Sequence, residues 1–179
     1  MLILASGSPR RKELLKKVFS DYTVIVPNID ERILDLDPKD LPAEESKEKA
    51  YAIHALYPND AVLACDTIVV LNGEILGKPK DEADAIRMLK LQSGKRQVVL
   101  SGYTYIDAHK EVTRTVMTYV YFNVLSDELI AAYVKDKKPL DKAGAYGIQD
   151  GYPLINHIEG SFDNVMGLPT EDIGKHCLN

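Results

Sequence analysis

The chain has 179 residues, of which 45% are hydrophobic and 27% charged, and this composition is typical of one globular domain with a proper core. A formal net charge of −5 argues against a protein that coats nucleic acid, because such proteins carry a basic excess. The two cysteines predict no disulfide framework, no run of about 18 apolar residues predicts a membrane span, and no signal segment is expected, so we expect a cytoplasmic protein.

The N-terminal half alternates predicted strands and helices. Ser8 and Pro9 are typical of an N-cap and a first helical residue, and Asn72-Gly73 is typical of a type I′ hairpin turn. In chain order the predicted elements are a strand at 2–5, a helix from Pro9 with Val18 and Phe19 on its apolar stripe, a strand at 22–26, a loop at 30–42, a helix at 43–57, a strand at 61–71 and a return strand at 74–76.

The C-terminal half contains a long predicted hairpin between helices. Its predicted elements are a helix from the cap Asp81 to Leu91, strands at 98–106 and 111–124, a helix at 127–136 capped by Ser126, and a last short helix capped by Thr170. Because strands and helices alternate early and a hairpin follows, we expect an α/β fold with a mixed sheet. Residues 1–179 are interpreted as a single domain, with room for two lobes.

The first candidate site is the loop Ser6-Gly7-Ser8-Pro9-Arg10-Arg11, between a predicted strand and a predicted helix. Free backbone N–H groups and the positive end of the helix dipole meet at such a point, and guanidinium groups match the geometry of phosphate. The loop therefore predicts an anion site. A capped helix with two solvated arginines is the alternative, and these residues by themselves leave both open.

The second candidate is Asp66, a lone carboxylate inside a strand of apolar residues. Burying a charge costs roughly several kcal/mol unless a cation or hydrogen bonds compensate it. Asp66 is therefore expected to be a metal ligand, a general base or half of a structural ion pair.

Two further segments carry weaker signals. Lys78, in Gly77-Lys78-Pro79, lies on a stiff turn that suits a phosphate contact, although a solvated turn lysine is the commoner outcome. Gln149, at the end of the glycine-containing segment 143–149, has an amide that can read the edge of a base. A glycine turn without a ligand is the alternative there.

Carboxylates are the expected metal ligands, because the four histidines show no metal-ligand spacing. Glu31, Glu45 and Asp66 are the candidates, and oxygen ligands of this kind favour Mg²⁺ or Mn²⁺. Glu45 and Lys49 are also four residues apart on a predicted helix, which is usual for a surface ion pair.

Taken together, these segments resemble the Maf family of nucleoside triphosphate pyrophosphatases over nearly the whole chain. The matching motifs are Ala5 to Arg11, Asp30-Glu31, Lys49-Ala50, Asp66-Thr67, Gly77-Lys78-Pro79, Ala143 to Gln149, Ile158 to Ser161 and Asn164 to Pro169. The sequence departs from the family pattern at Gln97, where a histidine is usual, and at Asp150, where a glycine is expected.

The resemblance implies a twisted mixed sheet flanked by helices, in two lobes with a central cleft, similar to inosine triphosphate pyrophosphatases. It implies hydrolysis of a nucleoside triphosphate to the monophosphate and pyrophosphate with a divalent cation, and it allows a homodimer. Asp66 would accept the proton of the attacking water. The triphosphate would be held by Ser8, Arg10, Arg11, Lys49 and Lys78, and the residues linked to substrate choice are Arg10, Thr67 and Gln149.

The Gly147-Ile148-Gln149 form of the fourth motif looks like the subgroup that acts on dTTP and UTP. A modified or purine nucleoside triphosphate is the alternative substrate. A nucleotide-binding regulator of cell division without enzymatic activity is the alternative function.

Overall fold

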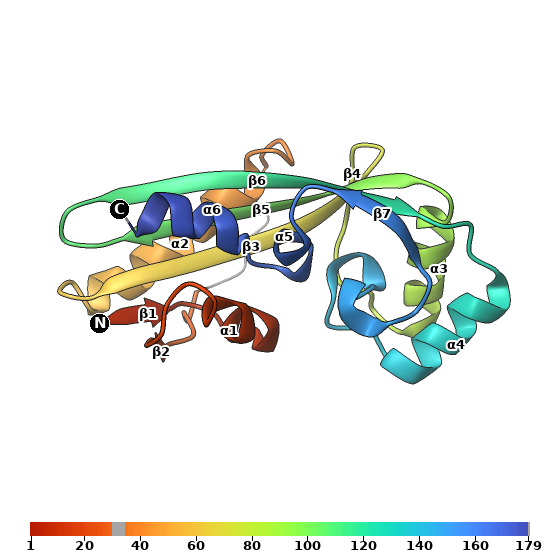
Figure 1. The fold of residues 1–179 in the computed structure, drawn as a ribbon, viewed down its shortest axis with the longest axis horizontal. Coiled ribbons are helices and arrows are strands. Elements are labelled where there is room, and N and C mark those ends of the chain that lie inside the picture. The colour runs from red at the N-terminus through yellow and green to blue at the C-terminus, as the bar shows by residue number, and fades with distance from the viewer. Residues whose placement is uncertain (30–34, 179) are drawn as a thin grey trace. The chain divides into compact units, whose positions relative to one another are not determined.

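The computed structural model describes residues 1–29 and 35–178. The strands are β1 (Leu2–Leu4), β2 (Thr23–Val24), β3 (Ala61–Leu71), β4 (Glu74–Leu76), β5 (Arg96–Ile106), β6 (Glu111–Phe122) and β7 (Ile155–Glu159). Among the described residues they form one seven-stranded sheet in the order β2-β1-β3-β5-β6-β7, with β4 paired to β3 (Figure 1). Since β1 is parallel to β2 and β3 while β4 and β7 are antiparallel to their neighbours, the expected mixed sheet is confirmed.

Helices alternate with single strands and with hairpins along the chain, as expected for an α/β fold. They are α1 (Pro9–Leu15), α2 (Leu41–Leu56), α3 (Glu82–Gln92), α4 (Asp127–Lys137), α5 (Phe162–Met166) and α6 (Thr170–Cys177), with 3₁₀ turns η1 (Ala143–Ala145) and η2 (Ile148–Asp150). None of the described helices is long and apolar enough to cross a membrane.

The chain divides into two compact units. The first, called unit 1 here, contains Met1–Thr67, Leu100–Val116 and the C-terminal residues from Gly167; unit 2 contains Ile68–Val99 and Met117–Met166. The strands β3, β5 and β6 each contribute residues to both units.

In unit 1, two helices cover opposite faces of β5. The Tyr103 hydroxyl donates to a carboxylate oxygen of Asp172 on α6 at 2.7 Å, and the hydroxyl of Thr104 shares a hydrogen bond with Ser46 on α2 at 2.8 Å. Because successive residues of a strand point to opposite faces, α6 and α2 lie on opposite sides of the sheet here (Figure 1). Ala50 and Ile53 of α2 enter the unit 1 core beneath the sheet.

Gly102 lets the start of α2 approach β5 closely. A Cβ atom built on Gly102 would lie 2.2 Å from the backbone nitrogen of Ala43 and 2.5 Å from the carbonyl oxygen of Pro42. Real Cβ atoms do not approach backbone at these distances, so only glycine fits. The position of α2 on the sheet therefore depends on a missing side chain.

In unit 2, the apolar faces of β3, β5, β6, α3 and α4 enclose a separate core. The hairpin between β3 and β4 turns at Asn72 and Gly73, with φ angles of 50° and 83°. Two positive φ angles at the central residues define the type I′ turn that the sequence predicts.

The caps and ends of the helices test several predictions made from the sequence. The side chains of Ser8, Asp81 and Ser126 cap α1, α3 and α4 as predicted. The Thr170 prediction is wrong, because Pro169 is the N-cap of α6 and Thr170 is its first residue. Helix α1 ends at Leu15, before the predicted stripe residues Val18 and Phe19.

The strand β7 and the helix α5 are not predicted from the sequence. Residues 155–159 contain three polar side chains among five, and α5 has only five residues, so neither shows a clear apolar period. Pairing with β6 is what makes 155–159 a strand.

We predict that Gly102→Ala lowers the free energy of unfolding by at least about 1–3 kcal/mol, as for other overpacked sites. Urea unfolding measures the change. The matched control is Gly174→Ala, since nothing lies within 4 Å of a Cβ at that α6 position and alanine favours helix. Equal stability of the two variants would contradict the close approach of α2.

Candidate active site

The N-terminal loop has the capped geometry that its sequence predicts. The Ser8 Oγ atom accepts from the backbone N–H of Arg11 at 3.3 Å, and the Ser8 N–H donates to Ser6 Oγ at 3.2 Å. Pro9 is the first residue of α1, where its missing N–H costs nothing. The hydroxyls of both serines thus help shape the turn between β1 and α1.

Arg11 reaches back across unit 1 and binds two protein groups. Its Nε donates to the carbonyl oxygen of Gly167 at 2.7 Å, and one terminal nitrogen donates to Thr67 Oγ1 at 3.1 Å. Arg10, the preceding residue, is half-buried on the same helix. Arg11 therefore has a structural role that the sequence prediction of a phosphate ligand did not include.

Thr67 is the centre of a hydrogen-bonded group on β3. Its hydroxyl shares a hydrogen bond with Ser101 Oγ on β5 at 2.8 Å and also donates to the Gly167 carbonyl oxygen at 3.3 Å. Sequence reasoning missed Ser101, although a fully buried hydroxyl within an apolar strand is the same kind of signal as Asp66. These contacts fix the direction of the Thr67 side chain.

Asp66 forms an ion pair with Lys49 of α2. The Lys49 Nζ atom lies 3.1 Å from Asp66 Oδ1, and the two side chains are 22% and 23% exposed. Of the three roles expected for Asp66, the structure therefore shows the ion pair, and its partial exposure leaves the carboxylate within reach of a ligand. The sequence pairs Lys49 only with Glu45 on the same helix, whereas the structure gives Lys49 a partner on β3.

The alternation of β3 separates the two groups. Cys65 Sγ and Thr67 Oγ1 both contact the Gly167 carbonyl oxygen, while Asp66 between them faces α2. This is the pattern expected when residues i and i+2 share one face of a strand. Complete burial raises the pKa of the Cys65 thiol, which identifies Cys65 as a core residue instead of a nucleophile.

The remaining unit 1 candidates are the carboxylates proposed for metal. Glu45 lies on α2, one helical turn before Lys49, and is half-buried. Glu31 lies outside the described residues. Within 1–29 and 35–178 there is no cluster of three or more His, Cys, Asp or Glu side chains arranged to hold a metal ion.

Lys78 and Gln149 both belong to unit 2 and are exposed. Lys78 follows β4, and Gln149 lies in η2. Their two segments are joined, because the N–H of Gly144 donates to the carbonyl oxygen of Gly77 at 3.1 Å. The structure thus brings together, within unit 2, two segments that the sequence identified separately.

We predict that Arg11→Lys destabilises the protein by about 1–2 kcal/mol, because a lysine ammonium cannot reproduce the forked contact with Gly167 and Thr67. Thermal unfolding measures the change. Arg87→Lys is the control, since Arg87 is 58% exposed and pairs with Asp84 within α3, where about 0–0.5 kcal/mol is expected. If the Arg11→Lys variant is as stable as the Arg87→Lys variant, the contacts of Arg11 with Gly167 and Thr67 do not stabilise the fold.

The chain is similar to known proteins over nearly its whole length. The family described as Maf-like protein matches residues 1–177. A protein of Pyrococcus furiosus named dTTP/UTP pyrophosphatase is 46% identical over 170 residues, which cover 94% of this chain and 89% of that protein. A protein of Thermosipho africanus with the same name is 48% identical over 173 residues, covering 96% and 89%.

Among solved structures, that of the Staphylococcus aureus Ham1 protein is similar with a TM-score of 0.48 and 21% identity, over 70% of this chain and 72% of that chain. The family match extends over both units, and the relatives are more than two-fifths identical along nearly their full length. The chain therefore belongs to the Maf-like protein family.

Proposed function

We propose that this protein is a pyrophosphatase that hydrolyses dTTP and UTP to the nucleoside monophosphate and pyrophosphate. The relatives named above carry this activity in their names. In this chain the proposal is supported by the half-buried ion pair of Asp66 and Lys49, which places a carboxylate and an ammonium side by side. Residues 1–179 act as one catalytic domain in this proposal, since the family match is not confined to either unit.

Asp66 accepts the proton of the water that attacks the α-phosphorus. Its Oδ1 atom is held by Lys49, so the carboxylate has a defined direction on β3 before substrate arrives. A positioned base of this kind typically contributes about 10²–10⁴-fold to the rate. Lys49 also supplies positive charge next to the base, which suits the phosphate chain that must lie there.

The N-terminal loop supplies further positive charge. Arg10, Arg11 and Ser8 lie at the start of α1 and are proposed phosphate ligands. Lys78, on the turn after β4, is also a proposed phosphate ligand. Arg11 acts in part through Thr67, whose hydroxyl it orients. Thr67 and Gln149 are the proposed determinants of substrate choice.

The residues present fit a divalent cation such as Mg²⁺ or Mn²⁺. Mg²⁺ is usually bound by one or two protein carboxylates together with water and substrate phosphates, so a site needs no three-carboxylate cluster. Asp66 is partly exposed and offers oxygen donors, and Glu45 and Glu31 are the further candidates. A bound cation would neutralise charge on the phosphate oxygens.

A homodimer, which the family resemblance allows, is part of this proposal. The mass of the purified protein in solution tests it.

The proposed activity is tested by pyrophosphate release from a panel of nucleoside triphosphates with Mg²⁺. We expect the highest kcat/KM with dTTP and UTP and a lower value with dATP, dGTP and ITP. A purine or modified nucleotide as the best substrate would overturn the proposed specificity. If the protein binds nucleotides but hydrolyses none of them, it is a nucleotide-binding protein and the proposed enzymatic activity is rejected.

We predict that Asp66→Asn reduces kcat with dTTP by about 10²–10⁴-fold, because the amide cannot accept the proton. The matched control is Asp60→Asn, which removes a partly exposed carboxylate paired with the N-terminal ammonium at 3.3 Å. Thermal unfolding of both variants shows that they are folded. Near-normal pyrophosphate release by Asp66→Asn would reject the base role.

A further inference from the structure

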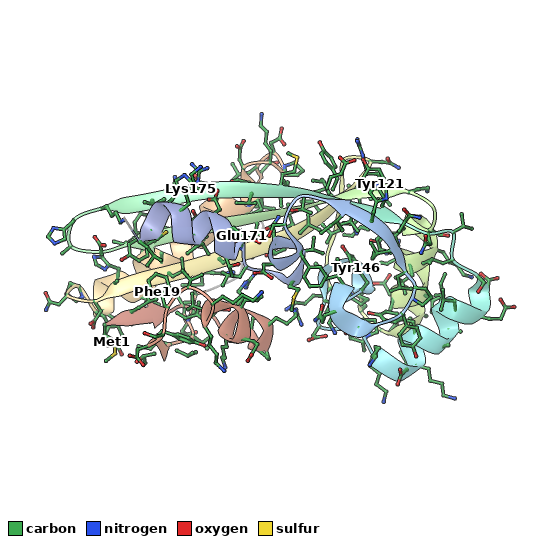
Figure 2. All side chains as sticks on the ribbon, viewed as in Figure 1. Met1, Phe19, Tyr121, Tyr146, Glu171 and Lys175 are labelled. Atoms are coloured by element: carbon green, nitrogen blue, oxygen red, sulfur yellow. The ribbon has the colours of Figure 1, made fainter. Side chains whose placement is uncertain are left out.

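Hydrogen bonds from buried side-chain amides hold the segment from η1 to η2, residues 143–150. The Gln92 amide is fully buried and donates to the carbonyl oxygen of Gly144 at 2.7 Å. Gln97 donates to the Gln92 side-chain oxygen at 2.6 Å. The hydroxyl of Tyr146, a residue labelled in Figure 2, donates to Gln97 Oε1 at 3.3 Å. Buried amides are costly unless they are satisfied, so this chain favours one backbone path for the segment.

A second attachment holds the other end of the segment. The Tyr133 hydroxyl donates to Asp150 Oδ2 at 2.6 Å and accepts from the backbone N–H of Gly147 at 2.8 Å. Tyr133 is fully buried, and the Asp150 side chain is only 13% exposed, with Lys142 Nζ 3.9 Å away. Burial and the hydrogen bond to the Asp150 carboxylate both raise the pKa of Tyr133, which favours the protonated phenol as the donor.

The three residues of η2 point in different directions. Ile148 packs against the unit 2 core, Gln149 is exposed, and Asp150 turns inward to Tyr133. The Asp150 carboxylate is thus paired beneath the segment, while the Gln149 side chain is exposed. A Cβ on Gly147 would lie 2.8 Å from Asp150 Oδ2, so the glycine allows this closed arrangement.

We infer that the hydrogen bond between Tyr133 and Asp150 is a latch that positions Gln149 for recognition of the nucleobase. Tyr133 and Asp150 are positioning residues, and of these three residues only Gln149 contacts the base. This inference rests on the proposed function, because it names how the site of that reaction selects its substrate. The bond from Gly144 to Gly77 extends the same support to the backbone that precedes Lys78.

The test is the selectivity of Tyr133→Phe, which removes one hydroxyl and keeps the buried ring. We expect the ratio of kcat/KM for dTTP to that for dGTP to fall about tenfold, the effect of losing roughly one charge-assisted hydrogen bond. The loss should appear in KM for dTTP with kcat within about twofold, because Gln149 contributes equally to ground-state and transition-state binding.

Two Asp150 variants distinguish a latch from a general structural effect. Asp150→Asn keeps an oxygen that accepts from Tyr133, so its selectivity should stay close to that of the unchanged protein, whereas Asp150→Ala should resemble Tyr133→Phe. The double variant Tyr133→Phe/Asp150→Ala should be no worse than either single one, since both remove the same bond. Additive losses would overturn the latch.

Tyr152→Phe is the matched control. The Tyr152 hydroxyl donates to Asp136 Oδ2 at the same distance of 2.6 Å, in an exposed tyrosine–aspartate bond that holds no part of residues 143–150. We expect its selectivity to be unchanged. An equal fall in Tyr152→Phe, or unchanged selectivity in Tyr133→Phe, would overturn the inference.

Hydrogen exchange of the Gly147 amide tests the latch without turnover. This amide donates to the Tyr133 hydroxyl, so it should exchange faster in Tyr133→Phe and at the unchanged rate in Tyr152→Phe. If the unchanged protein releases no pyrophosphate, the proposed function fails while the exchange still reports on the latch. Faster exchange of the Gly147 amide with unchanged selectivity would mean that the bond between Tyr133 and Asp150 is structural and has no role in base recognition.

Discussion

Two neighbouring polar residues in the apolar strand β3 need partners, and the candidate active site is built from those partners. Asp66 takes its partner from α2, where Lys49 lies 3.1 Å away, and Thr67 takes Arg11 and Ser101. Because residues one apart on a strand face opposite ways, these partners come from different sides of the sheet. The strand therefore joins the N-terminal loop to α2 through two adjacent side chains.

This constraint explains why distant features of unit 1 matter to the site. Lys49 reaches Asp66 only if α2 lies close to the sheet, and the missing side chain of Gly102 permits that approach. Arg11 has carbonyl and hydroxyl partners that hold Gly167 near Thr67. The polar groups of the site are thus oriented by packing and by main-chain contacts before any ligand binds, which is the condition for efficient electrostatic stabilisation.

Unit 2 follows a different physical rule, because its candidate residues are exposed and their supports are buried. Gln149 is at the surface, while Gln92, Gln97 and Tyr133 beneath it are almost completely excluded from water. A buried polar network is stable only when every member is satisfied, so it specifies one backbone conformation above it. Asp150 is part of that support, because it accepts the hydrogen bond from Tyr133.

The sequence by itself determined most helices, the long strands, the type I′ hairpin and three side-chain caps, since these depend on local periodicity and on residues with fixed backbone preferences. It also singled out Asp66, because a charge in an apolar strand must be compensated. Only the tertiary structure decided that Lys49 compensates it, that Arg11 binds Gly167, and that 155–159 form a strand. Those contacts join residues far apart in the chain. The local pattern of residue types does not indicate which distant residue becomes the partner.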